Sequence, residues 1–355
     1  MTPQLNRNKT IDVAKGIGIF LLFLITHNFW MPSPILRIDG YVLMPFFFIL
    51  CGMVFKKDSL KHTAKRKALS LLVPYFFFCF VGVGVSIFLY SIGMYEGRLF
   101  DDYKRIISLV YWIIAGTPSE LKNIYMNPMW FVSCLFFSSL LLQIILKFNN
   151  LIVRIISVLS CLLLSYVLSQ FKKEGSYPFN IDVALLAVFF LYVGYSSKKY
   201  SAFLELKPKT NMIIATPPIM LLFVYSLYLV DQDIPVLAYY HIPNYILFIV
   251  ISLSGSYLLY YTSSILSLKN ERNILQSIGR NSIVYMAFHW CILHGFLYNI
   301  LSIIGVNESY MGSLWYVFSI LLCIAQFVII QILEKPTKKV LGNIKHRLEK
   351  QDVLL

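Results

Sequence analysis

The sequence predicts an all-α membrane protein, a polytopic bundle of about ten transmembrane helices with both termini in the cytoplasm. Composition is the first reason, because 58% of the 355 residues are hydrophobic and only 14% are charged. Soluble domains contain about 25% charged residues, so this composition is typical of proteins that face lipid. The other reasons are the lengths of the apolar runs and the placement of Lys and Arg between them.

Apolar runs long enough to cross a bilayer recur along the whole chain. We expect an integral-membrane domain at 1–340 and a short basic cytoplasmic tail at 341–355. The segment 105–115 is too short to cross, so we interpret it as an interfacial or re-entrant piece. The expected spans lie at approximately 11–30, 40–55, 69–92, 129–148, 151–170, 181–196, 211–230, 242–266, 281–304 and 312–333.

The distribution of positive charge orients these spans. With the N-terminus inside, 24 of the 31 Lys and Arg residues lie on the cytoplasmic side. Loops that stay in the cytoplasm carry an excess of Lys and Arg, so this orientation is favoured. The net charge of +14 then requires no nucleic-acid partner. The span 11–30 begins with charged residues and has no small-residue cleavage site after it, so we expect it to be retained rather than cleaved as a signal peptide.

The cysteines give no sign of metal or redox chemistry. All six lie in expected spans, without metal-ligand or C-x-x-C spacing. We interpret them as small apolar packing residues, and no metal site is predicted.

The first span carries three polar residues on one face. At about 100° per residue, Lys15 and His27 lie about 60° to either side of Asp12. Ionisable groups inside a membrane helix are costly, so they mark a functional path. We expect Asp12 to neutralise Lys15 or a basic residue of a neighbouring helix.

His27 lies in the outer part of this span. A neutral imidazole there could remove a proton from a hydroxyl as a general base. The alternative is a structural His that hydrogen-bonds a neighbouring helix or a lipid headgroup. The chain shows no Ser, His and acid in a recognisable order, so a covalent triad is not indicated.

The loop before the third span contains a cluster of cations. Lys65, Arg66 and Lys67 precede the apolar run that begins at Leu69. Arg forms forked contacts with phosphate and Lys supplies a mobile point charge, so this cluster could hold phosphates. Positive-inside topology alone also predicts such a loop.

Two further segments carry candidate binding residues. Asn127 and Trp130 open the fourth span from the outer side. Trp130 is either a platform for the apolar face of a sugar ring or an ordinary interfacial aromatic residue. His289, in the ninth span, either faces a cavity or donates a hydrogen bond between helices.

The motifs follow a recognisable order along the chain. They are Asp12-x-x-Lys15-Gly16 with His27, Met44-Pro45-x-Phe47-Phe48, the basic run into Leu71-Leu72-x-Pro74-Tyr75, Trp130-Phe131, and Gly279-x-Asn281-Ser282 leading to Tyr285 and His289. This order resembles bacterial acyltransferase family 3, whose members are polytopic carbohydrate O-acyltransferases. The closest resemblance is to the fucose 4-O-acetylase-like branch. Cys51 stands where members commonly have Ser, and His27 lies one residue further from Asp12 than the family pattern.

The resemblance implies a function and roles for these residues. The enzyme would move an acyl group, usually acetyl, from acetyl-CoA or another acyl-CoA to a hydroxyl of a saccharide or lipid-linked saccharide, without a tightly bound cofactor. It would be a multi-pass protein of the bacterial inner membrane. His27 would be the general base and Asp12 a charge partner. The CoA nucleotide would lie near Lys15, Lys65, Arg66 and Lys67, and the acceptor near Trp130, Asn127 and His289.

Other classes of protein also have charged residues within a helix bundle. A transporter or flippase for a lipid-linked saccharide explains the spans equally well, although we find no internal repeat and no paired Gly- or Pro-broken helices. A family member without activity could instead serve as an assembly partner in envelope polysaccharide synthesis. Transport predicts substrate movement without acetyl-CoA, whereas the enzyme predicts acyl transfer that is lost with His27. The sequence leaves the acceptor sugar and the oligomeric state open.

Overall fold

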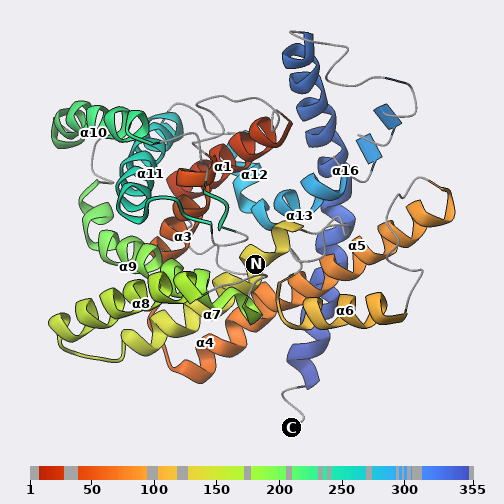
Figure 1. Ribbon diagram of the computed structural model, residues 1–355, viewed down its shortest axis with the longest axis horizontal. Coiled ribbons are helices and arrows are strands. Elements are labelled where there is room, and N and C mark those ends of the chain that lie inside the picture. Colours follow the sequence, from red (N-terminus) through yellow and green to blue (C-terminus); the bar gives the residue numbers. More distant parts are fainter. Residues whose placement is uncertain are drawn as a thin grey trace, which may run out of the picture. The chain divides into compact units, whose positions relative to one another are not determined.

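The computed structural model describes most of the chain as helices (Figure 1). The described residues are 8–27, 39–93, 103–117, 127–171, 177–204, 210–230, 235–237, 241–268, 274–292, 296–297, 300–301, 305 and 314–351. Among them, the only β-type pairing is an isolated bridge between Val236 and His241. The prediction of an all-α fold is therefore confirmed.

The helices follow the expected apolar runs. The first half of the chain contains α1 (Lys9–His27), η1 (Asp39–Leu43), α3 (Met44–Met53), α4 (Leu60–Lys67), η2 (Ala68–Leu72), α5 (Val73–Ser91), α6 (Tyr103–Ile114), η4 (Asn127–Met129), α7 (Trp130–Ile145) and α8 (Leu151–Phe171). The second half contains η5 (Pro178–Asn180), α9 (Ile181–Leu204), α10 (Thr210–Tyr228), α11 (Tyr245–Leu268), α12 (Ile274–Arg280), α13 (Ser282–Ile292) and α16 (Leu314–Gln351).

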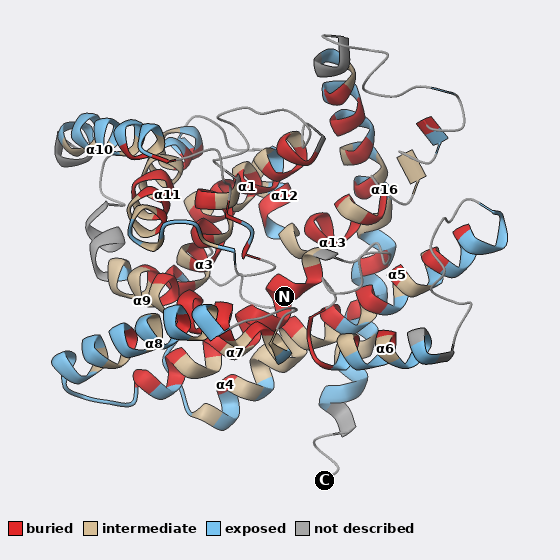
Figure 2. Cartoon of the chain, in the orientation of Figure 1, coloured by how far each residue is buried: buried red, intermediate tan, exposed pale blue. Residues whose placement is uncertain are grey.

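Helix length and the exposure of apolar residues confirm a membrane bundle. Within the described residues, five helices are long and apolar enough to cross a bilayer, and four more are apolar but shorter. In α8, only 11% of the most apolar stretch is buried (Figure 2). A helix that is apolar on all sides and also exposed is stable only against lipid. The number of spans and the side of each terminus remain predictions.

One compact unit consists of residues 1–56, 189–237 and 241–282. In it, α1 packs against α3, α11 and α12. Ile11 and Ala14 of α1 form a core cluster with three residues of α3: Phe46, Leu50 and Met53. The apolar face of α1 therefore lies against its neighbours.

The second compact unit consists of residues 57–188, 238–240 and 283–355. Here α4 and η2 pack on α7, while α5 contacts α16. Most of α7 is buried (Figure 2). The boundary that we expected at residue 340 falls within the continuous helix α16, so the division into a domain and a tail stays a prediction.

Candidate functional site

Asp12 pairs with a cation from a distant part of the chain. Its carboxylate lies 3.3 Å from Nε of Arg280, the last residue of α12. The Asp12 side chain is only 3% exposed, whereas that of Arg280 is 50% exposed. A buried carboxylate requires such compensation because an unpaired charge would be costly. Of the partners expected for Asp12, the neighbouring-helix cation is therefore the one observed.

Close packing of glycines brings the two residues together. A Cβ atom added to Gly16 would lie within 3.0 Å of the Leu275 backbone in α12. One added to Gly279 would lie within 3.0 Å of the Asp12 backbone in α1. The backbone of α12 at Leu275 therefore packs on α1 at Gly16, and the backbone of α1 at Asp12 packs on α12 at Gly279. The absence of a side chain at each glycine permits this close approach. Two sequence motifs that lie far apart along the chain form a single contact between α1 and α12.

Lys15 and His27 occupy the same helix as Asp12. Lys15 is half-buried in the N-terminal half of α1, and His27 is the final residue of this helix. Because α1 is an unbroken helix, the rise from Lys15 to His27 is about 18 Å. The side chain of His27 lies outside the described residues, so its role as general base stays a prediction.

A basic pocket forms in the second unit. Its volume is about 430 Å³, and it lies between the α4–η2 segment and the C-terminal part of α16. Lys65 and Arg66, both predicted from the sequence to bind phosphate, line it. The residues that complete the lining are His62, Leu69, Ser70, Lys345 and Glu349. Lys67 is half-buried and does not line this pocket.

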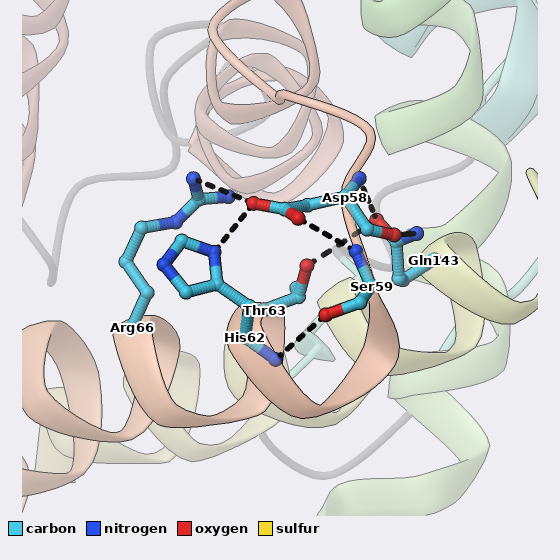
Figure 3. A network of polar contacts seen from close by, with 6 residues as sticks. All are labelled: Asp58, Ser59, His62, Thr63, Arg66 and Gln143. Atoms are coloured by element: carbon cyan, nitrogen blue, oxygen red, sulfur yellow. Dashed lines mark hydrogen bonds and ion pairs between the residues drawn. The ribbon is translucent and has the colours of Figure 1, made fainter.

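An acidic residue at the start of α4 orients two residues of this pocket. Figure 3 shows the Asp58 carboxylate directed at His62 and Arg66. His62 Nδ1 donates to Asp58 Oδ2 at 2.5 Å, and Arg66 Nη1 lies 3.9 Å from the same oxygen. The Ser59 backbone N–H also donates to Asp58 Oδ1 at 2.7 Å. These contacts lower the pKa of Asp58, first through the Ser59 N–H and then through His62.

A buried glutamine fixes this segment to α7. The Gln143 side-chain amide accepts from the Asp58 N–H at 3.2 Å and donates to the Asp58 carbonyl oxygen (Figure 3). Its oxygen also accepts from the Thr63 hydroxyl at 3.4 Å. Ser59 caps the helix by accepting from the His62 N–H at 3.2 Å. The backbone that presents His62 and Arg66 is therefore held from both sides.

The predicted acceptor residues lie elsewhere in the second unit. Trp130 begins α7 and is only 6% exposed, with its ring centroid 6.2 Å from that of Phe131. Asn127 begins η4, and its side chain lies outside the described residues. Neither observation tests a role in saccharide binding.

His289 is buried in α13. Its Nδ1 donates to the Met286 carbonyl at 2.6 Å, and the Gln326 side-chain amide of α16 donates to the His289 carbonyl. One turn earlier, the Tyr285 hydroxyl donates to Glu334 of α16 at 3.3 Å. The His289 side chain thus donates within its own helix, whereas the hydrogen bonds to α16 involve its backbone carbonyl and the Tyr285 hydroxyl. Both interpretations of His289 stay predictions.

Sequence reasoning missed several of these residues. Arg280 lies just before the expected span 281–304 and received no role, although the adjacent Gly279 signals close helix packing. Lys345 and Glu349 were assigned to a tail rather than to a pocket. Gln143 carried no motif, but a Gln inside an apolar run is itself a signal, since a buried amide requires partners.

Comparison with known proteins identifies the family. A family model described as an acyltransferase domain matches residues 8–332, which is nearly the whole chain. The chain belongs to acyltransferase family 3. No curated protein and no solved structure matches it. The family 3 match begins just before α1 and ends within α16, so it includes Asp12, His27, Arg280 and the α4 cations.

Membership of acyltransferase family 3 accounts for the membrane bundle and for the class of reaction. The chain is a membrane-bound acyltransferase of this family.

Proposed function

We propose that this family member is a membrane-bound O-acyltransferase that moves an acetyl group from acetyl-CoA to a hydroxyl of a cell-envelope or exported saccharide. The match to acyltransferase family 3 over residues 8–332 is the observation that carries this proposal. We place the protein in the fucose 4-O-acetylase-like branch and in the bacterial inner membrane. A longer acyl-CoA is the alternative donor, and a lipid-linked saccharide is the alternative acceptor.

In the proposed reaction, His27 is the general base. Its neutral imidazole takes the proton of the acceptor hydroxyl, and that oxygen attacks the thioester carbonyl carbon. The new C–O bond forms, the C–S bond breaks, and the imidazolium returns its proton to the departing CoA thiolate. The continuous helix α1 supports this assignment because it places His27 about 18 Å from Lys15, a distance comparable with an extended pantetheine arm.

The cations of the chain supply binding sites for the donor phosphates. Lys65 and Arg66 line the basic pocket, whose volume of about 430 Å³ lies within the range of about 300–1,000 Å³ typical of ligand sites. Arg66 is suited to a forked contact with a phosphate, and Lys65 supplies a point charge. We also assign phosphate contacts to Lys15 and Lys67. Trp130, Asn127 and His289 are our candidates for acceptor binding.

Transfer of labelled acetyl from acetyl-CoA to extracted envelope glycans tests this function. Membranes containing the wild type should label the glycan, and those containing His27→Ala at matched expression should not. The exposed His241→Ala serves as the control, and it should label as the wild type does. Equal label in wild type and His27→Ala would keep the enzyme but remove His27 as the base.

Two further measurements complete this test. Longer acyl-CoA donors and lipid-linked acceptors, each offered separately, show which variant of substrate is used. Movement of a lipid-linked saccharide across the membrane without acetyl-CoA, and with no transfer to any acceptor, would favour a transporter instead.

A further inference from the structure

An apolar groove adjoins the basic pocket. It has a volume of about 480 Å³ and lies between α5 and α16. We call it the phenylalanine groove, after three of its lining residues. The complete lining is Val73, Phe76, Phe77, Phe80, Val81 and Ile344.

The groove and the basic pocket share both of their walls. On one wall, Ser70 lines the pocket and Val73 lines the groove, so that one helical turn separates them. On the other wall, Lys345 lines the pocket and the preceding residue Ile344 lines the groove. A charged site and an apolar site therefore lie next to each other, between the continuous helical stretch Leu60–Ser91 and α16 of the second unit.

The exposure of the groove residues indicates an apolar environment. Phe80 is 70% exposed and Phe76 is 36% exposed. In the expected orientation, this first part of α5 enters the bilayer from the cytoplasmic surface. Basic pockets at the cytoplasmic surface bind anionic lipid headgroups, and the region below the headgroups contains acyl chains. The order of charge in α4 and then phenylalanine in α5 matches the order of headgroup and then acyl chain.

We propose that the basic pocket and the phenylalanine groove together bind one anionic phospholipid. Its phosphate lies among Lys65, Arg66 and Lys345, and one acyl chain lies against Phe76, Phe77 and Phe80. Against these cations stand the Glu349 carboxylate in the lining and Asp58, 3.9 Å from Arg66. Among the described residues of this site, three Lys and Arg side chains stand with two carboxylates, so the site prefers a lipid with a net negative charge.

In the proposed function, Lys65 and Arg66 also bind the phosphates of CoA, and the competition between lipid and donor rests on that function. A lipid phosphate in the pocket competes with the donor, so anionic lipid raises the KM for acetyl-CoA. A free nucleotide has no acyl chain to fill the phenylalanine groove. Residues of the groove therefore affect lipid binding and leave CoA binding unchanged.

Lipid binding to the full chain in detergent tests the site directly. Native mass spectrometry counts bound phosphatidylglycerol and phosphatidylcholine from an equimolar mixture. The wild type should retain phosphatidylglycerol preferentially. We expect Lys345→Ala to weaken its binding about tenfold through the loss of a charged contact, and Phe80→Ser about three- to tenfold through the loss of apolar contact.

Two control variants make the comparison specific. Phe88→Ser alters an exposed phenylalanine of α5 that does not line the groove, and Lys339→Ala alters an exposed cation of α16 that does not line the pocket. Both should bind phosphatidylglycerol as the wild type does. Equal retention of the two lipids by the wild type, or equal effects of Phe80→Ser and Phe88→Ser, would overturn the proposal. Thermal unfolding in the same detergent verifies that each variant is folded.

Titration with CoA separates the two sources of phosphate. Phe80→Ser should bind CoA with unchanged affinity, whereas an equal loss of CoA and lipid binding would assign the groove to the donor and overturn the lipid site. Loss of lipid selectivity with intact acetyl transfer would refute the lipid site alone. Intact lipid selectivity without acetyl transfer to any acceptor would refute the proposed function alone.

Discussion

Removal of the Arg280 side-chain charge should destabilise the contact between α1 and α12. Asp12 is 3% exposed and its carboxylate lies 3.3 Å from Arg280 Nε. The variant Arg280→Gln keeps much of the side-chain volume but removes the positive charge. It removes the cation whose Nε lies 3.3 Å from a buried carboxylate.

The magnitude follows from the burial of the two partners. Breaking a fully buried ion pair by removing one partner costs about 3–5 kcal/mol. Here Arg280 is 50% exposed, so water reaches one side of the pair and reduces the penalty. A hydrogen bond to a charged group contributes about 1.5–3 kcal/mol. We therefore expect Arg280→Gln to lower the free energy of unfolding by about 2 kcal/mol.

A double-mutant cycle measures the pair itself. The variants are Asp12→Asn, Arg280→Gln and their combination, unfolded reversibly by SDS in mixed micelles. The double variant removes the buried Asp12 carboxylate together with its cation, so it should be more stable than Arg280→Gln alone, with a coupling energy of about 1–2 kcal/mol. Lys335→Gln, which removes an exposed cation of α16, is the control and should change stability by less than about 0.5 kcal/mol.

The reasoning fails if the cycle gives no coupling. Additive effects of Asp12→Asn and Arg280→Gln would show that the observed contact contributes nothing to stability. An effect of Arg280→Gln no larger than that of Lys335→Gln would show that water, rather than Arg280, compensates the carboxylate.

Three further predictions concern packing and the network of Figure 3. Gly279→Ala places a Cβ against the α1 backbone and should lower the free energy of unfolding in SDS by about 1–3 kcal/mol. The control Gly342→Ala, at an open position of α16, should not lower it. Equal stabilities of the two variants would contradict the close approach of α1 and α12. Gln143→Leu removes the side-chain amide that bonds the backbone N–H and carbonyl of Asp58 (Figure 3). This variant should lower the unfolding temperature and increase amide hydrogen exchange of α4, and unchanged exchange would refute the role of Gln143. The folded state lowers the Asp58 pKa from its usual 3.8, so its ionised form stabilises the protein above that pH and loses this contribution as pH falls through the folded pKa. Wild type and Asp58→Asn should thus differ in unfolding temperature near pH 7 and converge in acid, and a constant difference would exclude this titration.

The fold followed from the sequence because membrane helices impose a strong constraint. Every backbone polar group in lipid must be satisfied within its own segment, so apolar length alone locates the helices. The segment 105–115, expected as a short interfacial or re-entrant piece, lies largely in the helix α6, and α8 matches the predicted span 151–170 within one residue at its end. The shared face of Asp12, Lys15 and His27 stays a prediction from helix periodicity, because the His27 side chain lies outside the described residues.

The contacts between helices could not be predicted in the same way. Asp12 and Arg280 are 268 positions apart, and no local pattern states which loop cation lies beside α1. Lys345 was expected in a short cytoplasmic tail, and only the packing of α16 against α5 brings it to the same pocket as Lys65. Periodicity reports the face of one helix, but the partner of that face depends on how all helices pack together.

The reciprocal glycine contacts restrict how α1 can move. The backbones of α1 and α12 approach each other at Gly16 and Gly279, which have no side chains. A shift of α1 along α12 by one residue, about 1.5 Å, would place the side chains that flank each glycine against the backbone of the neighbouring helix. Sliding at this end of α1 is thereby blocked, whereas the contact does not reach the opposite end, where His27 lies. Any displacement of His27 during turnover must therefore come from tilting of α1 about the Gly16–Gly279 contact, or from α1 and α12 moving together as one rigid piece.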